Sequence, residues 1–248
     1  MPSYMTALGF PVTTEQDFRH YVYQASEFGQ KIETAHGSYT LWTPGSGIEL
    51  WVQTNLHRRI IGMNPHFAGE ARMQVELTRR VIRHEHTILD GAFYGWANVE
   101  TSTSEPGQYP LVFDVPDYDV HNKLSLPCRR SVQLAAFAHE LQGFESKEAY
   151  LASQRGEVRL AVESFIPSGI FARGGVIKEP PLAQAHFSGY VLETEKKMNP
   201  ITRQKFYWAR VHTPGGEIDV VADPQVVQGN IVRNGVIRGS FWLSGRLV

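Results

Sequence analysis

The last eleven residues of the chain, RGSFWLSGRLV (238–248), decide the predicted fold of its C-terminal part. Phe241, Leu243 and Leu247 alternate with Trp242 and Arg246. A period of two residues is typical of a β-strand with one face toward a core. The pattern predicts a closing strand that buries Phe241, Leu243 and Leu247. It also raises the question of what contacts a tryptophan and an arginine on the opposite face.

The residues before this strand predict a small β-barrel. From His186 onward, short apolar-polar alternations are separated by turn signals, and Asn234-Gly235 is the strongest hairpin signal among them. The predicted strands are HFSGYVLETEKKMN, KFYWARVHTP, GEIDVVAD and GVIRGSFWLSGRLV. A long first strand, a hairpin, a short connection and a closing hairpin resemble the layout of an OB-fold. The resemblance implies a barrel domain over residues 182–248 and carries no function with it.

This predicted barrel presents an aromatic and basic face. The side chains that strand alternation places on it are Phe206, Trp208, Arg210, His212, Arg238, Trp242 and Arg246. Residues 182–248 contain eight Lys or Arg and five Asp or Glu, so a basic excess is concentrated here in a chain of net charge −1. Several partners fit such a face. They are another part or another copy of the same chain, a different protein that uses Trp and Arg as anchors, single-stranded nucleic acid that stacks on the rings, or a sugar or small molecule.

The N-terminal part predicts an antiparallel sheet with one main helix. The stretch MTALGFPV (5–12) is apolar enough for a buried strand, and TTEQDFRHYVYQASEFG follows with helical spacing of its apolar residues. GSYTLWTP and GIELWVQTN then form a predicted hairpin around Pro44-Gly45-Ser46-Gly47, and RRIIGMNPHF is a further strand. The order strand, helix, three strands resembles one βαβββ module of the vicinal-oxygen-chelate (glyoxalase-like) fold. That resemblance implies a cupped sheet whose strands carry His and Glu metal ligands.

The middle of the chain predicts helices. In SVQLAAFAHELQGFESKEAYLASQ, Val132, Leu134, Ala135, Ala138 and Leu141 mark an apolar stripe at helical spacing. Gly143 is the expected end of this helix, and a second short helix begins near Ser146. The predicted fold class is therefore α+β. Its three parts are a sheet domain over 1–115, a connector with helices and a Pro/Gly-rich linker over 116–181, and the OB-like barrel over 182–248.

One carboxylate is a weak candidate for catalysis. Glu49 shares a strand face with Trp51 and Gln53. If the sheet is cupped, this polar stripe lines a pocket, and a desolvated Glu49 could act as a general base. If the sheet is open to water, the stripe is an ordinary outer face, which is the more frequent arrangement.

Three histidines are weak candidates for metal binding. His84 and His86 in RHEH point the same way if the segment is a strand, and His66 could supply a third ligand. The spacing matches no helical zinc motif of the HExxH type. A solvated loop is the more frequent reading of such a segment, so we predict no bound metal and no cofactor.

Bulk composition excludes several classes of protein. The chain has 248 residues, one cysteine and 42% hydrophobic residues, which predicts a sizeable core without disulfides. It contains no GxGxxG after a strand, no GxxxxGK[ST] and no GxSxG, which disfavours dinucleotide, P-loop and α/β-hydrolase chemistry. We expect no signal peptide, no membrane span and a cytoplasmic location.

These observations favour a non-catalytic binding or assembly protein that uses the aromatic and basic face. The expected partner is a protein or a second copy of the chain. Two alternatives remain open. One is a small-molecule enzyme with a pocket in an N-terminal cupped sheet, and the other is single-stranded nucleic-acid binding through the OB-like barrel.

Overall fold

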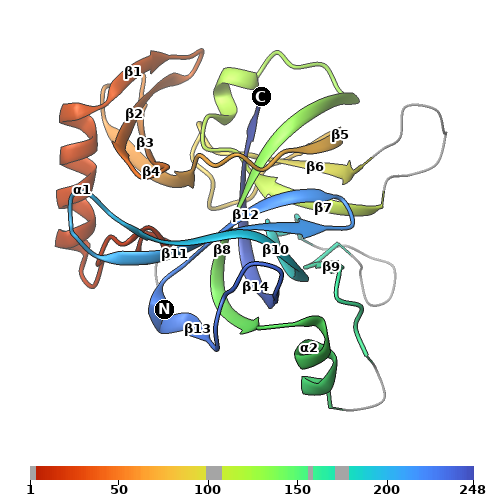
Figure 1. Ribbon diagram of the computed structural model, residues 1–248. Coiled ribbons are helices and arrows are strands. Elements are labelled where there is room, and N and C mark those ends of the chain that lie inside the picture. Colours follow the sequence, from red (N-terminus) through yellow and green to blue (C-terminus); the bar gives the residue numbers. More distant parts are fainter. Residues whose placement is uncertain (1–3, 99–107, 156–158, 171–178) are drawn as a thin grey trace.

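The protein consists mainly of β-strands arranged in two sheets (Figure 1). The computed structural model describes residues 4–98, 108–155, 159–170 and 179–248. The antiparallel first sheet, in spatial order, contains β1 (Gln30–Glu33), β2 (Gly37–Gly45), β3 (Ile48–Asn55) and β4 (Ile60–Phe67). The mixed second sheet contains β5 (Met73–Val81), β6 (Ala92–Ala97), β7 (Tyr109–Asp114), β8 (Cys128–Phe144), β9 (Ser164–Pro167), β10 (Gln184–Met198), β11 (Lys205–Thr213), β12 (Gly216–Ala222), β13 (Val227–Gln228) and β14 (Val236–Leu247).

Helical elements are few. The α-helices are α1 (Glu15–Phe28) and α2 (Lys147–Ser153), and the 3₁₀-helices are η1 (Thr6–Leu8), η2 (Tyr118–His121) and η3 (Pro224–Val226). Helix α1 lies where helical spacing predicts it and begins with a capping box, in which Thr14 and Asp17 exchange side-chain and backbone hydrogen bonds. Among the described residues no helix has both the length and the apolar content that crossing a lipid bilayer requires.

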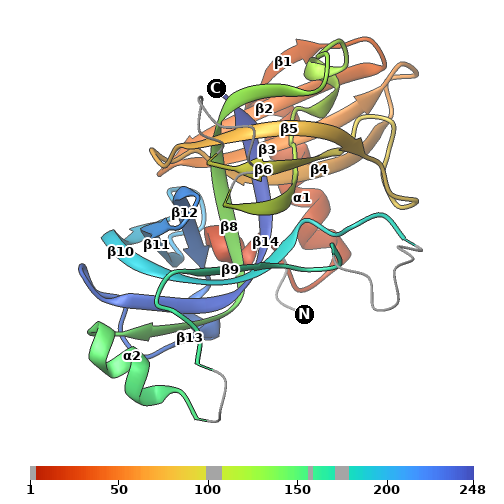
Figure 2. The ribbon, with the colours of Figure 1, turned by 90° about the vertical axis from the view of Figure 1, so that its right-hand side faces the viewer.

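The second sheet closes into two rings of strands. One ring runs through β8, β14, β10, β11 and β12 and back to β8. The other runs through β8, β5, β6, β7 and β14, where a single pair, Asp114 with Ser244, joins β7 to β14. The long strands β8 and β14 belong to both rings and lie side by side in the middle of the molecule (Figure 2).

The predicted helical middle segment is wrong, because residues 128–144 form the strand β8. Both faces of β8 are buried from Val132 to Ala138. Val132 and Leu134 contribute to one core, and Ala135 and Phe137 contribute to another. A strand buried on both faces is a nearly continuous apolar run, and such a run also contains residues at helical spacing. The α+β class predicted from this segment is therefore replaced by a mostly β fold.

The predicted self-contained OB-like barrel is also wrong. Residues 182–248 do form strands at the expected places, but their ring is completed by β8, which pairs in parallel with β12. β14 pairs with β8 along almost its whole length, from Val236 to Leu247. The C-terminal strands therefore share their wall with strands from earlier in the chain. Gly174 and Gly175 of the expected linker lie outside the described residues.

The βαβββ start is not present either. Within residues 5–12, Thr6–Leu8 form the 3₁₀-helix η1, and no residue of this segment belongs to a strand. Gly9 follows with φ of 73°, a left-handed conformation that interrupts an extended backbone. All strands of the first sheet come after α1, and the apolar side chains of Leu8 and Phe10 are buried in the core beneath that sheet. The order of elements expected for a glyoxalase-like module is therefore absent.

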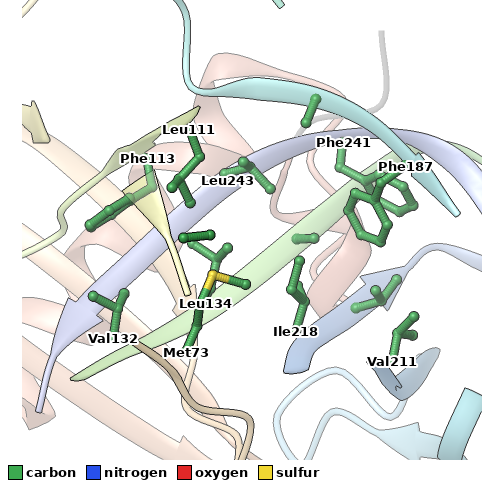
Figure 3. Close-up of a cluster of buried hydrophobic side chains, with 14 of the residues drawn as sticks. Met73, Leu111, Phe113, Val132, Leu134, Phe187, Val211, Ile218, Phe241 and Leu243 are labelled. Atoms are coloured by element: carbon green, nitrogen blue, oxygen red, sulfur yellow. The ribbon is translucent and has the colours of Figure 1, made fainter. Parts of the chain in front are cut away.

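Two large hydrophobic cores hold the molecule together. The first fills the two rings of the second sheet (Figure 3), and its members include Met73, Leu111, Phe113, Val132, Leu134, Phe187, Val211, Ile218, Phe241 and Leu243. The second lies between the first sheet with α1 and the outer side of the second sheet, and it includes Tyr21, Leu50, Phe67, Phe137, Phe206 and Trp242. Strand β14 contributes to both cores, because alternate side chains point to opposite faces.

Candidate functional site

A cavity of about 450 Å³ lies where β4, at the edge of the first sheet, meets the second sheet. Its wall is formed by β4, the connection from β5 to β6, the end of β7, the residues that lead into β10, and β14. Tyr4 from the N-terminal segment completes it. This volume is in the range of small-molecule sites, which lie preferentially between structural units.

Arg83 is the most buried charged group in this wall, with a relative exposure of 8%. Its Nε donates to the backbone oxygen of Pro181 at 3.1 Å. Its Nη1 lies 2.6 Å from Oδ1 of Asp114 and 2.9 Å from Nε2 of His86. Its Nη2 has no hydrogen-bond partner among the described residues. Three of the five N–H groups of Arg83 are thus used by the protein, and the two N–H groups of Nη2 are at an atom with almost no accessible surface.

Asp114 connects Arg83 to Trp242. Its second carboxylate oxygen accepts a hydrogen bond of 2.7 Å from Nε1 of Trp242. The indole is stacked with the ring of Tyr4, with ring centroids 4.2 Å apart. Burial raises the pKa of Tyr4, and the nearby charge of Asp114 raises it further. Tyr4 therefore faces the cavity as an uncharged phenol at neutral pH.

Asp90 joins the first sheet to the connection between β5 and β6. Its Oδ1 accepts hydrogen bonds from Gln53 at 2.5 Å and from Asn64 at 2.8 Å, and its Oδ2 accepts from the backbone of Thr87 at 2.9 Å. Three donors to one carboxylate hold this part of the wall in place.

A second group of polar side chains is buried between the sheets. His66 is fully buried, with Nδ1 2.8 Å from Oγ of Ser244 and Nε2 2.6 Å from Oε1 of Gln133. The amide nitrogen of Gln133 donates to Asp219, which also accepts from Nε1 of Trp208. Because the amide oxygen of Gln133 can only accept, Nε2 of His66 carries the proton and Ser244 donates to Nδ1. Burial lowers the pKa of His66 to about 4.

Glu49 lies in the same interface and has a basic partner. It is 5% exposed, and its two carboxylate oxygens accept from Arg246 and from Nε1 of Trp51, each at 2.9 Å. Arg246 also lies over the ring of Trp51, 4.9 Å from its centroid. Burial raises the pKa of Glu49, whereas Arg246 and Trp51 lower it by smaller amounts. The geometry is that of an ion pair between β3 and β14.

The residues predicted to share an aromatic and basic face are divided between the interior and the surface. Phe206, Trp208 and Trp242 are buried in the core between the sheets. The basic residues have separate partners, namely Glu49 for Arg246, Gln142 for Arg238, Glu193 and Glu217 for Arg210, and Glu163 for His212. On the outer face of β14, Trp242 contacts Tyr4 and Asp114, and Arg246 contacts Glu49.

The three histidines considered for metal binding do not share one site. Both ring nitrogens of His66 are hydrogen-bonded, His84 is exposed, and His86 lies against Arg83. In the part of the chain that the structure describes, no group of three His, Cys, Asp or Glu residues could hold a metal ion.

The sequence singles out the segment that contains Arg83 and the strand that contains Trp242, but it does not indicate that they line one cavity. Arg83 belongs to the RHEH segment, and Asp114 lies about thirty residues further along the chain, in FDVPDYDVH. No local pattern shows that these residues form an ion pair with each other and a hydrogen bond with Trp242. Comparisons of the chain with protein-family models, curated proteins and solved structures find no match. The chemistry of the cavity is therefore the basis for a functional proposal.

Proposed function

We propose that the protein binds a small molecule in the cavity between β4 and the second sheet, without catalysing a reaction on it. The observation that carries the proposal is the cavity itself, a space of about 450 Å³ whose wall combines apolar and aromatic side chains with the ion pair of Arg83 and Asp114. A concave site with a mostly apolar lining and a few fixed polar groups is the usual form of a small-molecule site.

The rest of the wall supports binding more than catalysis. Met63, Pro65 and Val115 provide apolar surface, and Trp242 and Tyr4 provide aromatic surface. The carboxylates of Asp90 and Asp114 already accept hydrogen bonds from the protein. In the described part of the wall, Glu85 is the carboxylate without a hydrogen bond to the protein, and it is exposed to solvent instead of being held against the cavity by a partner.

The other functions considered from the sequence receive less support. Nucleic-acid binding by stacking requires exposed rings, and Trp208 and Trp242 are each 7% exposed. An enzyme with Glu49 as general base requires a carboxylate that can accept a proton from a substrate, and both oxygens of Glu49 have protein partners.

Filling the rim of the cavity is expected to abolish binding. Leu182 lines the cavity and is 46% exposed, so Leu182→Trp adds volume at the rim without changing the core. Saturation-transfer NMR with a mixture of toluene, benzamide, benzoate and benzylamine should show contact of at least one compound with the wild-type protein. The signal should fall at least fivefold in Leu182→Trp.

The matched control is Ile166→Trp, because Ile166 is 45% exposed and lies on β9 outside this cavity. Its signals should equal those of the wild type. The proposal is wrong if none of the four compounds gives a signal, or if the signals do not depend on position 182.

A further inference from the structure

We propose that the occupant of this cavity is an organic cation, a molecule that carries a protonated amino group on a mostly apolar body. This inference rests on the proposed function and adds the chemical class of the ligand. It follows from the charges of the wall, from which of these charges an occupant can reach, and from the apolar remainder of the wall.

The described part of the wall carries more negative than positive charge. Its carboxylates are Glu85, Asp90 and Asp114, and its only arginine or lysine is Arg83. Nη1 of Arg83 can only donate, so Nε2 of His86, 2.9 Å away, accepts this hydrogen bond and the imidazole adds no charge. Three carboxylates against one guanidinium give these side chains a formal charge of −2. A cavity with this sign of charge favours the entry of cations over that of anions.

Two of the three carboxylates have no basic partner among the described residues. The donors to Asp90 are the side-chain amides of Gln53 and Asn64 and the backbone of Thr87, which carry no net charge. Glu85 is exposed and accepts no hydrogen bond from the described part of the protein. Both carboxylates therefore keep a full negative charge with which a cation in the cavity can interact.

The guanidinium of Arg83 is less accessible to an occupant than its carboxylate partner. The side chain of Arg83 is 6% exposed, and that of Asp114 is 26% exposed. A carboxylate has about four acceptor positions, and the recorded donors to Asp114 are Arg83 and Trp242. An occupant therefore reaches the oxygens of Asp114 more readily than the donors of Arg83.

The shape and lining of the cavity favour an organic cation over a metal ion. Among the described residues no group of three His, Cys, Asp or Glu could hold a metal ion, so the carboxylates of the wall do not converge on one point. The space of about 450 Å³ has room for an organic molecule. Met63, Pro65, Val115 and Leu182 offer carbon atoms to the body of such a ligand.

A ranking of three compounds on the wild-type protein tests the class. At neutral pH benzylamine is a cation, benzyl alcohol is uncharged and benzoate is an anion, and all three carry the same ring. Dissociation constants from NMR titration at low salt should place benzylamine at least tenfold tighter than the other two. If benzyl alcohol or benzoate binds as tightly as benzylamine, the ligand class is wrong, although a small-molecule site remains.

Salt gives a second measurement on the same protein. Raising sodium chloride from about 0.02 M to about 0.3 M should weaken benzylamine about threefold and leave benzyl alcohol unchanged, because salt screens the interaction between accessible charges. An equal response of the two compounds to salt contradicts an electrostatic preference for the cation.

Glu85→Lys reverses one charge of the wall at an exposed position. The affinity for benzylamine should fall about tenfold, whereas the affinity for benzyl alcohol should stay the same, which separates a changed charge from a blocked cavity. Glu70→Lys is the matched control, because Glu70 is also exposed and lies outside this cavity, and it should leave both affinities near those of the wild type. Unchanged affinity for benzylamine in Glu85→Lys, or an equal fall for both compounds, overturns the inference.

Failure of the proposed function gives a different result from failure of the ligand class. If the function is wrong, no compound binds in a way that depends on Leu182. If only the ligand class is wrong, binding depends on Leu182, but benzylamine is not preferred or Glu85→Lys does not weaken it selectively.

Discussion

Replacing Asp114 with asparagine is expected to lower the free energy of unfolding by about 3 kcal/mol, the low end of the range for breaking a buried ion pair, because the side chain of Asp114 is 26% exposed. Asp114 accepts from Arg83 at 2.6 Å and from Trp242 at 2.7 Å, and the side chain of Arg83 is only 6% exposed. An asparagine has one acceptor oxygen for these two donors and no charge to compensate the guanidinium. Urea unfolding at pH 7.5, followed by circular dichroism, measures the loss.

Glu33→Gln is the matched control, since it neutralises a carboxylate in an exposed ion pair. Lys31 and Glu33 are 2.6 Å apart, but their side chains are 59% and 71% exposed. Surface pairs of this kind contribute about 0–1 kcal/mol, so this variant should unfold at nearly the wild-type urea concentration. A loss of less than about 1 kcal/mol for Asp114→Asn would contradict the view that Asp114 compensates a buried charge.

The position of β14 explains why one strand supports both the fold and the candidate site. Phe241 and Leu243 point into the core of the second sheet. Trp242, Ser244 and Arg246 point the other way, where they contact Asp114, His66 and Glu49. The same alternation therefore anchors the strand and builds one wall of the interface between the sheets. A one-residue shift in the register of β14 would exchange these two sets of side chains.

Local patterns in the sequence predicted those elements whose two faces differ in polarity. The alternation of apolar and polar residues indicated the strand β14. The helical spacing of apolar residues, together with the Thr14 cap, indicated the helix α1. β8 was missed because its middle is buried on both faces, so alternation is hidden. The alanines of AAFA, which favour helices, strengthened the wrong interpretation. In β8 the tertiary environment outweighs this local preference.

The candidate site was harder to predict, because its parts are distant in the sequence. Arg83, Asp114 and Trp242 come from the β5–β6 connection, the end of β7 and β14. The outward direction of Trp242 and Arg246 followed from alternation, but their partners did not. Gln133, which joins His66 to Asp219, lay inside the segment taken as a helix. Contacts of this kind depend on strand pairing, which no local pattern specifies.

Buried His66 is expected to make the fold less stable in acid. Its pKa is lowered from 6.5 to about 4 in the folded protein, mainly by burial. Between pH 6.5 and pH 4 the unfolded chain therefore binds more protons at this position than the folded chain does. Stability is complete above about pH 6.5 and falls as the pH is lowered toward 4. At about 1.4 kcal/mol per pKa unit, the loss approaches 3 kcal/mol.

His66→Gln removes the titrating ring and keeps an amide that can hydrogen-bond with Gln133 and Ser244. The variant should be less stable than the wild type at pH 7.5, but its urea midpoint should change less between pH 7.5 and pH 4.5. Burial raises the pKa of both Glu49 and Asp219, and these groups titrate in both proteins, so the difference between the two pH profiles isolates His66. The exposed His84, changed to Gln, should leave the wild-type profile intact. If the urea midpoints of His66→Gln and wild type change with pH in parallel, His66 does not control the acid sensitivity. The description of His66 as a neutral imidazole with both ring nitrogens hydrogen-bonded would then be wrong.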